Sequence, residues 1–140
     1  MIDRLKTRLS SEKGFTLIEL LVVIIILGIL LAIAIPSYLS FKDRANKSAA
    51  QANVRAAIPG VEAFAADNTG TGTSAGYFGL TDTALYTYDA SLTGKVHIDA
   101  SPTASTYCLY SVVGSFEYYK KDPAGAITAD SNPSDNVHCV

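Results

Sequence analysis

The sequence holds few of the residues on which enzyme and metal chemistry depend. Of its 140 residues only two are cysteine and two are histidine, and there is no tryptophan. His97 and His138 stand alone and are too few for a zinc site, so we expect a strand position for the first and a solvated tail for the second. No nucleophile motif, phosphate-binding loop or paired-cysteine zinc pattern occurs. These absences argue against an enzyme and point to no cofactor.

Charge is also scarce, and its two signs are separated along the chain. Charged residues make up 17% of the sequence. Residues 36–66 carry four basic and two acidic side chains, whereas residues 67–140 carry three lysines and eight acidic residues. An acidic C-terminal part argues against direct binding of nucleic acid through bulk charge.

One long apolar run dominates the composition. The 21 residues 15–35 are apolar except for Thr16, Glu19 and Gly28. As an α-helix at ~1.5 Å per residue they would extend roughly 32 Å, which matches a hydrocarbon core of ~30 Å. The run is longer than that of an ordinary secretory signal and has no clean Ala-x-Ala at its end. We therefore expect a charged leader over residues 1–14, followed by a membrane-spanning helix with no cleavage after its apolar run.

The helical pattern continues beyond the apolar run. Apolar residues recur at three- and four-residue spacings through residues 36–66, as in an amphipathic helix. Pro36 removes a backbone donor and predicts a bend. The pair Pro59–Gly60 predicts a second bend rather than an end, because the apolar spacing resumes after it. Residues 68–76 are rich in Gly, Thr and Ser and predict a loop.

Residues 67–140 predict a small globular head. A short helix is expected over residues 80–88, capped by Thr81 or Asp82, and strands over residues 95–100, 106–113 and 116–121. Gly114 and Ser115 predict a hairpin turn. Because such a sheet is marginal alone, we expect the second half of the helix to cover it, through the stripe Val54, Ile58, Val61 and Phe64. The predicted fold is α+β: a long bent N-terminal helix packed against an antiparallel sheet of about three strands or more.

The residues around position 15 carry a family resemblance. The stretch FTLIELLVVIIILGILLAIAIPSY begins at Phe15 directly after Lys13 and Gly14, holds Glu19, and has Pro36 at its end. Over residues 8–45 this closely resembles the type IV pilin family, and beyond them the chain shares only the family's general layout. The resemblance implies that a prepilin peptidase cuts between Gly14 and Phe15 and methylates the new Phe15 amine. It also implies assembly into a helical homopolymer by a cytoplasmic ATPase and an inner-membrane platform protein.

Glu19 places a carboxylate among aliphatic side chains. Inserting an acid costs about 2.5 to 3.5 kcal/mol at the membrane centre and less near an end. Glu19 is either tolerated near the interface or, as we favour, neutralises the Phe15 amine of its own or a neighbouring helix and so sets the axial register. Gly28 and Pro36 leave two interpretations open. They serve packing alone, or they bound a segment that loosens when the helix leaves lipid for a filament core.

Cys108 and Cys139 can form a single disulfide. The alternative is two free thiols in a reducing compartment. A bridge would close a loop of about 30 residues, a contribution of roughly 3 to 4 kcal/mol, and would place the head outside the cytoplasm. It would also supply the orientation of the membrane helix. The basic residues near the apolar run do not, because Arg4, Lys6, Arg8 and Lys13 before it are matched by Lys42, Arg44, Lys47 and Arg55 after it. Type IV pilins often hold the C-terminal segment to the sheet in this way.

These observations predict a structural subunit of a type IV pilus, stored in the cytoplasmic membrane as a prepilin and polymerised into an extracellular filament for adhesion, motility or DNA uptake. A pseudopilin of a type II secretion system or a minor pilin is the alternative. Asp130, Asn132 and Asp135 keep a calcium-bound pseudopilin open, although their spacing fits no EF-hand and turn chemistry explains them equally well. A membrane-anchored binding module that never polymerises is the third class.

Overall fold

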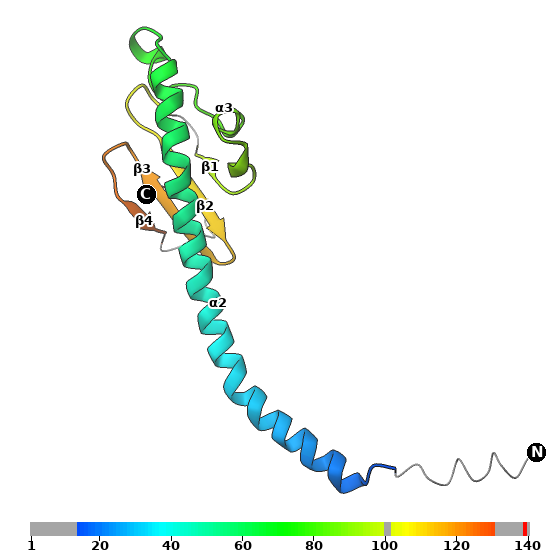
Figure 1. The fold of residues 1–140 in the computed structure, drawn as a ribbon. Coiled ribbons are helices and arrows are strands. Elements are labelled where there is room, and N and C mark those ends of the chain that lie inside the picture. The colour runs from blue at the N-terminus through cyan, green and yellow to red at the C-terminus, as the bar shows by residue number, and fades with distance from the viewer. Residues whose placement is uncertain (1–13, 100–101, 131–138, 140) are drawn as a thin grey trace, which may run out of the picture. The chain divides into compact units, whose positions relative to one another are not determined.

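The computed structural model describes residues 14–99, 102–130 and 139. The leader residues 1–13, Asn132, Asp135 and His138 lie outside these ranges. The chain divides into two compact units, Met1–Ser40 and Phe41–Val140. Helix α2 spans Leu17–Asp67, 51 residues, and is continuous through Pro36 and through Pro59–Gly60 (Figure 1). As expected, Pro59 does not end the helix. The bends predicted at Pro36 and at Pro59–Gly60 stay predictions.

The sheet of the second unit is a four-stranded antiparallel meander. Its order is β1 (His97–Ile98), β2 (Cys108–Val113), β3 (Phe116–Lys121) and β4 (Ile127–Ala129). The α+β fold is confirmed, and so are the hairpin turn between β2 and β3 and the strand position of His97. Two details of the prediction were wrong: β1 has two residues rather than six, and β4 was missed. The fourth strand is three residues long and too short to show a period of two in the sequence.

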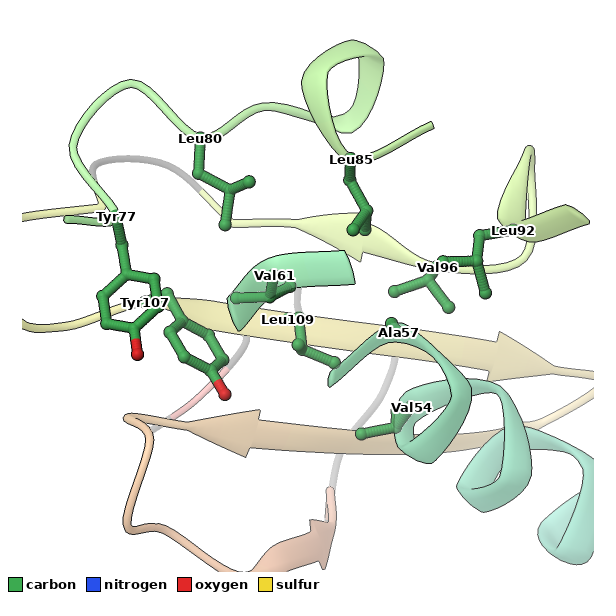
Figure 2. Close-up of a cluster of buried hydrophobic side chains, with 10 residues drawn as sticks. All are labelled: Val54, Ala57, Val61, Tyr77, Leu80, Leu85, Leu92, Val96, Tyr107 and Leu109. Carbon is green, nitrogen blue, oxygen red and sulfur yellow. The ribbon is translucent and has the colours of Figure 1, made fainter. Parts of the chain in front are cut away.

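The C-terminal half of α2 packs on one face of this sheet (Figure 1). Its fully buried side chains Val54, Ala57 and Val61 join Leu109 of β2 in a single core (Figure 2). The predicted stripe is therefore correct at Val54 and Val61, and Phe64 is partly buried against the same core. Ile58 is only half-buried. Ala50 and Ala57, completely buried, complete the contact line, because small side chains let the helix approach the sheet closely.

A second, short helix completes the cover of the core. Helix α3 spans Asp82–Tyr88, and its N-cap Thr81 accepts a hydrogen bond from the Ala84 N–H at 3.2 Å, as predicted. The helix lies against α2 at Gly60, where a Cβ atom would stand 3.0 Å from Leu85 Cδ1. This contact explains the glycine after Pro59. Two single-turn 3-10 helices, η1 (Gly72–Ser74) and η2 (Ala90–Leu92), flank α3, the first inside the segment predicted as loop.

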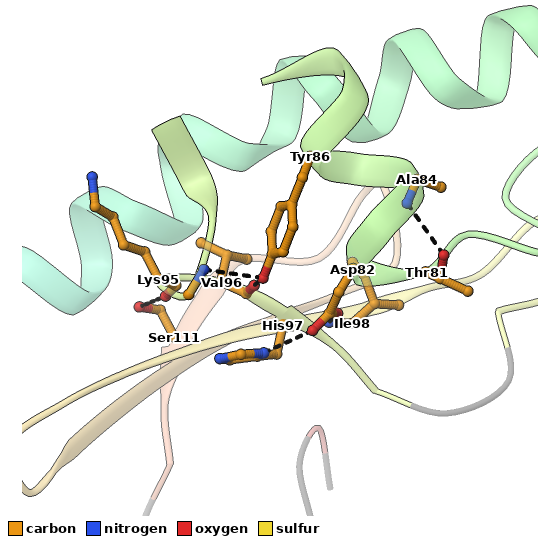
Figure 3. A network of polar contacts seen from close by, with 10 residues as sticks. Thr81, Asp82, Ala84, Tyr86, Lys95, Val96, His97, Ile98 and Ser111 are labelled. Atoms are coloured by element: carbon orange, nitrogen blue, oxygen red, sulfur yellow. Dashed lines mark hydrogen bonds and ion pairs between the residues drawn. The ribbon is translucent and has the colours of Figure 1, made fainter. Parts of the chain in front are cut away.

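Side-chain hydrogen bonds tie α3 to the edge of the sheet (Figure 3). The two carboxylate oxygens of Asp82 contact the Ile98 N–H at 2.7 Å and His97 Nδ1 at 2.8 Å. Tyr86 donates its hydroxyl proton to the carbonyl of Val96 at 2.7 Å. Because β1 has only two residues in the ladder, these bonds hold the strand where its backbone pairing is shortest.

Candidate functional site

Helix α2 begins with a reciprocal cap formed by Thr16 and Glu19. The carboxylate of Glu19 accepts hydrogen bonds from the Thr16 N–H at 2.9 Å and from the Thr16 hydroxyl at 2.8 Å. The hydroxyl of Thr16 in turn accepts from the Glu19 N–H at 3.3 Å. This is a capping box, which satisfies two backbone donors that a helix start leaves unpaired. Sequence reasoning missed Thr16, although the spacing Thr-x-x-Glu is the signature of such a cap.

The cap gives Glu19 a structural role alongside the proposed functional one. Phe15 precedes the cap directly, and its side chain is 88% exposed. Cleavage after Gly14 would leave both Thr16 and Glu19 in the chain, with a new amine one residue before the cap. The cap thus gathers an acid and a hydroxyl at the start of α2, directly after Phe15.

The first half of α2 is apolar around its whole circumference and exposed along its length. Every side chain of residues 14–40 is exposed, among them Leu21, Ile26 and Leu31, each at about half of its surface. Soluble monomers rarely leave an apolar surface of this extent open to water. Among the residues that the structure describes, α2 is the one helix that is both long enough and apolar enough to cross a membrane. Lipid, or other copies of the same helix, would cover this apolar surface and remove it from water.

Gly28 and Pro36 lie on this helix without partners that explain them. A Cβ atom at Gly28 would meet nothing within 4 Å, so no contact inside the described chain requires a glycine there. Pro36 cannot donate a backbone hydrogen bond. Next to it the Ser37 hydroxyl donates to the carbonyl of Ile33 at 3.3 Å, one turn earlier. Both interpretations of these residues, helix packing and local loosening, stay open as predictions.

A disulfide joins Cys108 of β2 to Cys139 near the end of the chain. The two residues are 31 positions apart and their Cα atoms are 6.1 Å apart. Cys139 is 7% exposed, so this residue is fixed against the sheet. A bridge of this kind is typical of proteins that fold outside the cytoplasm.

Burial raises the pKa of two tyrosines of the head, Tyr77 and Tyr107. Tyr77 donates its hydroxyl proton to Glu62 of α2 at 2.9 Å, and burial together with this carboxylate raises the pKa of Tyr77 to about 12. Tyr107 lies edge-on to it with ring centroids 4.7 Å apart, and burial raises its pKa as well. Both rings belong to the hydrophobic core, and a tyrosine kept neutral in a core indicates a packing role.

The comparison with known proteins places these features in a family. Residues 9–35 match the family model described as the prokaryotic N-terminal methylation motif. The chain is 35% identical over 102 residues to the type IV wide pilus major component PilA4 of Thermus thermophilus, which covers 72% of this chain and 73% of that protein. No solved structure matches the chain significantly.

Other relatives match mainly through the N-terminal part. The type IV major pilin protein PilA of Myxococcus xanthus is 45% identical over 53 residues, 38% of this chain and 24% of that protein. The type II secretion system core protein G of Pseudomonas aeruginosa is 39% identical over 58 residues, 41% of each chain. The chain thus spans well under half the length of these two relatives.

Proposed function

Because this chain belongs to the type IV pilin family, we propose that it is a structural subunit of a type IV pilus, held in the membrane as a prepilin and polymerised into an extracellular filament. The observation that carries this proposal is the first half of α2, which is apolar on all sides and exposed along its length. A helix of that kind needs lipid before assembly and identical helices after it. In a filament it would form the core, while the acidic, disulfide-closed head would form the surface.

Processing fits the start of α2. We propose cleavage between Gly14 and Phe15 by prepilin peptidase and methylation of the Phe15 amine, which the methylation motif over residues 9–35 supports. In this assignment residues 1–14 are the leader, 15–35 the membrane and filament-core helix, 36–66 its amphipathic continuation and 67–140 the head. An assembly ATPase and a platform protein in the membrane would draw the subunit into the filament.

Glu19 would set the register of assembly. A new amine at Phe15 and the carboxylate of Glu19 are the only charges expected in the apolar core, so each lowers the cost of burying the other. The capping box offers the carboxylate hydrogen bonds from Thr16 before assembly. A neighbour's amine would add the missing positive charge afterwards.

Three variants of Glu19 separate its charge from its cap. Glu19→Gln keeps an oxygen that can accept from Thr16 but removes the charge, whereas Glu19→Val and Glu19→Ala remove both. If charge pairing sets the register, all three variants insert into the membrane normally and fail to yield filaments. If Glu19→Gln assembles like the wild type and only the other two fail, the cap explains Glu19 and the register hypothesis is wrong.

The proposal as a whole is tested by mass spectrometry of filaments sheared from producing cells. Chains that begin at methylated Phe15 and carry a closed bridge between Cys108 and Cys139 would establish the major subunit. The resemblance to core protein G favours a pseudopilin of a type II secretion system as the second candidate, for which processed chains would remain in the membrane fraction. Chains still beginning at Met1 would contradict both and point to an anchored module.

A further inference from the structure

The second unit, Phe41–Val140, carries an acidic hollow on the flank where α3 meets β1. The hollow has a volume of about 590 Å³, and its lining includes Phe78, Asp82, Ile98, Asp99 and Pro102. The ring of Phe78 is 49% exposed. Each carboxylate oxygen of Asp82 contacts one group of its own chain and still has a lone pair to offer. The hollow therefore combines carboxylates with an open aromatic ring.

The opposite flank of the same unit presents two arginines. Arg44 and Arg55 are eleven residues apart on α2, close to three turns, so they share one face of the helix about 16 Å from each other. Both are exposed, and no ion pair to either is found among the described residues.

The two features face away from each other. Lys47, which lies on the arginine side of α2, stands over the ring of Phe116 at the start of β3, 4.7 Å from its centroid. Gly60, about 140° around the helix from Arg55, contacts α3. Figure 1 shows the same division, with α3 and β1 on one side of α2 and β3 and β4 on the other.

We propose that in the filament the face formed by Arg44 and Arg55 of one subunit docks against the acidic hollow of a second copy of this chain. The proposal rests on the proposed function, since it requires polymerisation. Guanidinium groups bind carboxylates through paired hydrogen bonds and stack on aromatic faces. Asp82, Asp99 and the exposed Phe78 supply both kinds of partner in one place.

The placement of the two surfaces predicts an open polymer. Complementary patches on opposite flanks make a heterologous contact, which repeats without closing when successive copies are also displaced along an axis. Such a displacement is required here. The hollow lies beside the C-terminal end of α2, where the Phe78 carbonyl accepts from Asn68, whereas the arginines lie earlier on the helix. Docking therefore displaces the second copy along the helix axis by roughly 20 to 36 Å, at ~1.5 Å for each of the 13 to 24 residues between the arginines and Asn68.

Zero-length coupling of carboxylates to amines tests the contact directly. Arg55→Lys keeps the charge and introduces an amine that carbodiimide can couple to a neighbouring carboxylate in intact filaments. We expect a ladder of cross-linked subunits on a denaturing gel, with peptides that join residue 55 to Asp82 or Asp99 of another chain. The native Lys42, about 200° around the helix from Arg44, is the internal control and should couple to neither. Filaments that couple residue 55 only to other carboxylates, or to none, would overturn the proposal while leaving the pilin function intact.

Charge reversal provides an independent test. Arg44→Glu combined with Arg55→Glu sets like charges against the hollow and should lower the yield of filaments about tenfold, and adding Asp99→Lys should restore most of it. Lys42→Glu reverses one positive charge on the other side of α2 and should leave the yield unchanged. Equal yields from the double variant and the control would refute the docking. A wild-type chain that forms no filaments would instead refute the proposed function on which it depends.

Discussion

The contact between Gly60 and Leu85 allows a prediction in which two opposing effects can be separated. Replacing glycine by alanine inside a helix favours folding by up to about 1 kcal/mol, because alanine has the better helix propensity. At Gly60 the new methyl would stand 3.0 Å from Leu85 Cδ1. Leu85 is completely buried and has little room to move, and overpacking of this kind costs about 1 to 3 kcal/mol. We therefore expect Gly60→Ala to destabilise the head by about 0 to 2 kcal/mol.

The effect of Gly60→Ala on the free energy of unfolding should change sign when Leu85 is replaced by a smaller residue. Leu85→Ala alone should cost about 2 to 5 kcal/mol through the cavity it leaves. In that background the methyl of Gly60→Ala meets no crowding, so the substitution should stabilise the head by about 0.5 to 1 kcal/mol through helix propensity. The double-mutant cycle would then give a coupling free energy of about 1 to 3 kcal/mol between the two residues.

The cycle can be measured by denaturant unfolding of the full chain in mild detergent. Tyrosine fluorescence reports on the head, since all of the eight tyrosines except Tyr38 lie beyond residue 76. Gly28→Ala is the matched control, because a methyl there meets nothing within 4 Å and should leave the unfolding of the head unchanged. A zero coupling free energy, with Gly60→Ala equally stabilising in both backgrounds, would refute the close approach of α3 to α2.

Three further predictions concern the disulfide, the buried phenols and the helix cap. Reducing the bridge between Cys108 and Cys139, which are 31 residues apart, should lower the free energy of unfolding by about 3 to 4 kcal/mol; an unchanged midpoint after complete thiol labelling would contradict this. Because burial raises the pKa of Tyr77 to about 12, against about 10 in the unfolded chain, the folded state holds a proton that the unfolded state has lost. The contribution of Tyr77 to the free energy of unfolding should thus be constant below pH ~10 and fall between pH ~10 and ~12. Unfolding measured across this pH range should show a smaller loss in Tyr77→Phe than in the wild type. Thr16→Val removes the hydroxyl of the cap and should weaken the first turn of α2 by about 1 kcal/mol, seen as faster amide exchange, yet filaments should still form. A loss of filaments as complete as in Glu19→Val would mean that the cap, rather than the charge, governs assembly.

Local signals in the sequence were sufficient for much of this fold. The apolar run and the spacing after it predicted α2, and the β-rich stretches and the turn at Gly114 predicted β2 and β3. Thr81, one of the two caps expected for α3, is the N-cap. The sequence alone did not reveal the role of Gly60, because the contact with Leu85 joins residues 25 positions apart. The capping box at Thr16 was local and could have been found, but the apolar setting of Glu19 directed attention to its charge.

The candidate functional site could likewise be predicted from the sequence only in part. Its residues near Phe15 were predicted from the resemblance of that stretch to type IV pilins and stay a prediction, whereas the expected pairing of the only two cysteines is confirmed. The acidic hollow could not be predicted, since Asp82 and Asp99 are brought together only when α3 lies beside β1.

A helix that is apolar on every side has no preferred azimuth. Rotating it about its own axis exchanges one aliphatic side chain for another, in lipid or in a bundle of identical helices, with little change in free energy. Apart from the pairing proposed at Glu19, cohesion along the core can then tolerate many screw angles, and the directional contacts between heads would help to select one of them. Substitutions on the head surface are therefore expected to alter the twist of a filament more readily than its tensile strength, and substitutions in the apolar half the reverse.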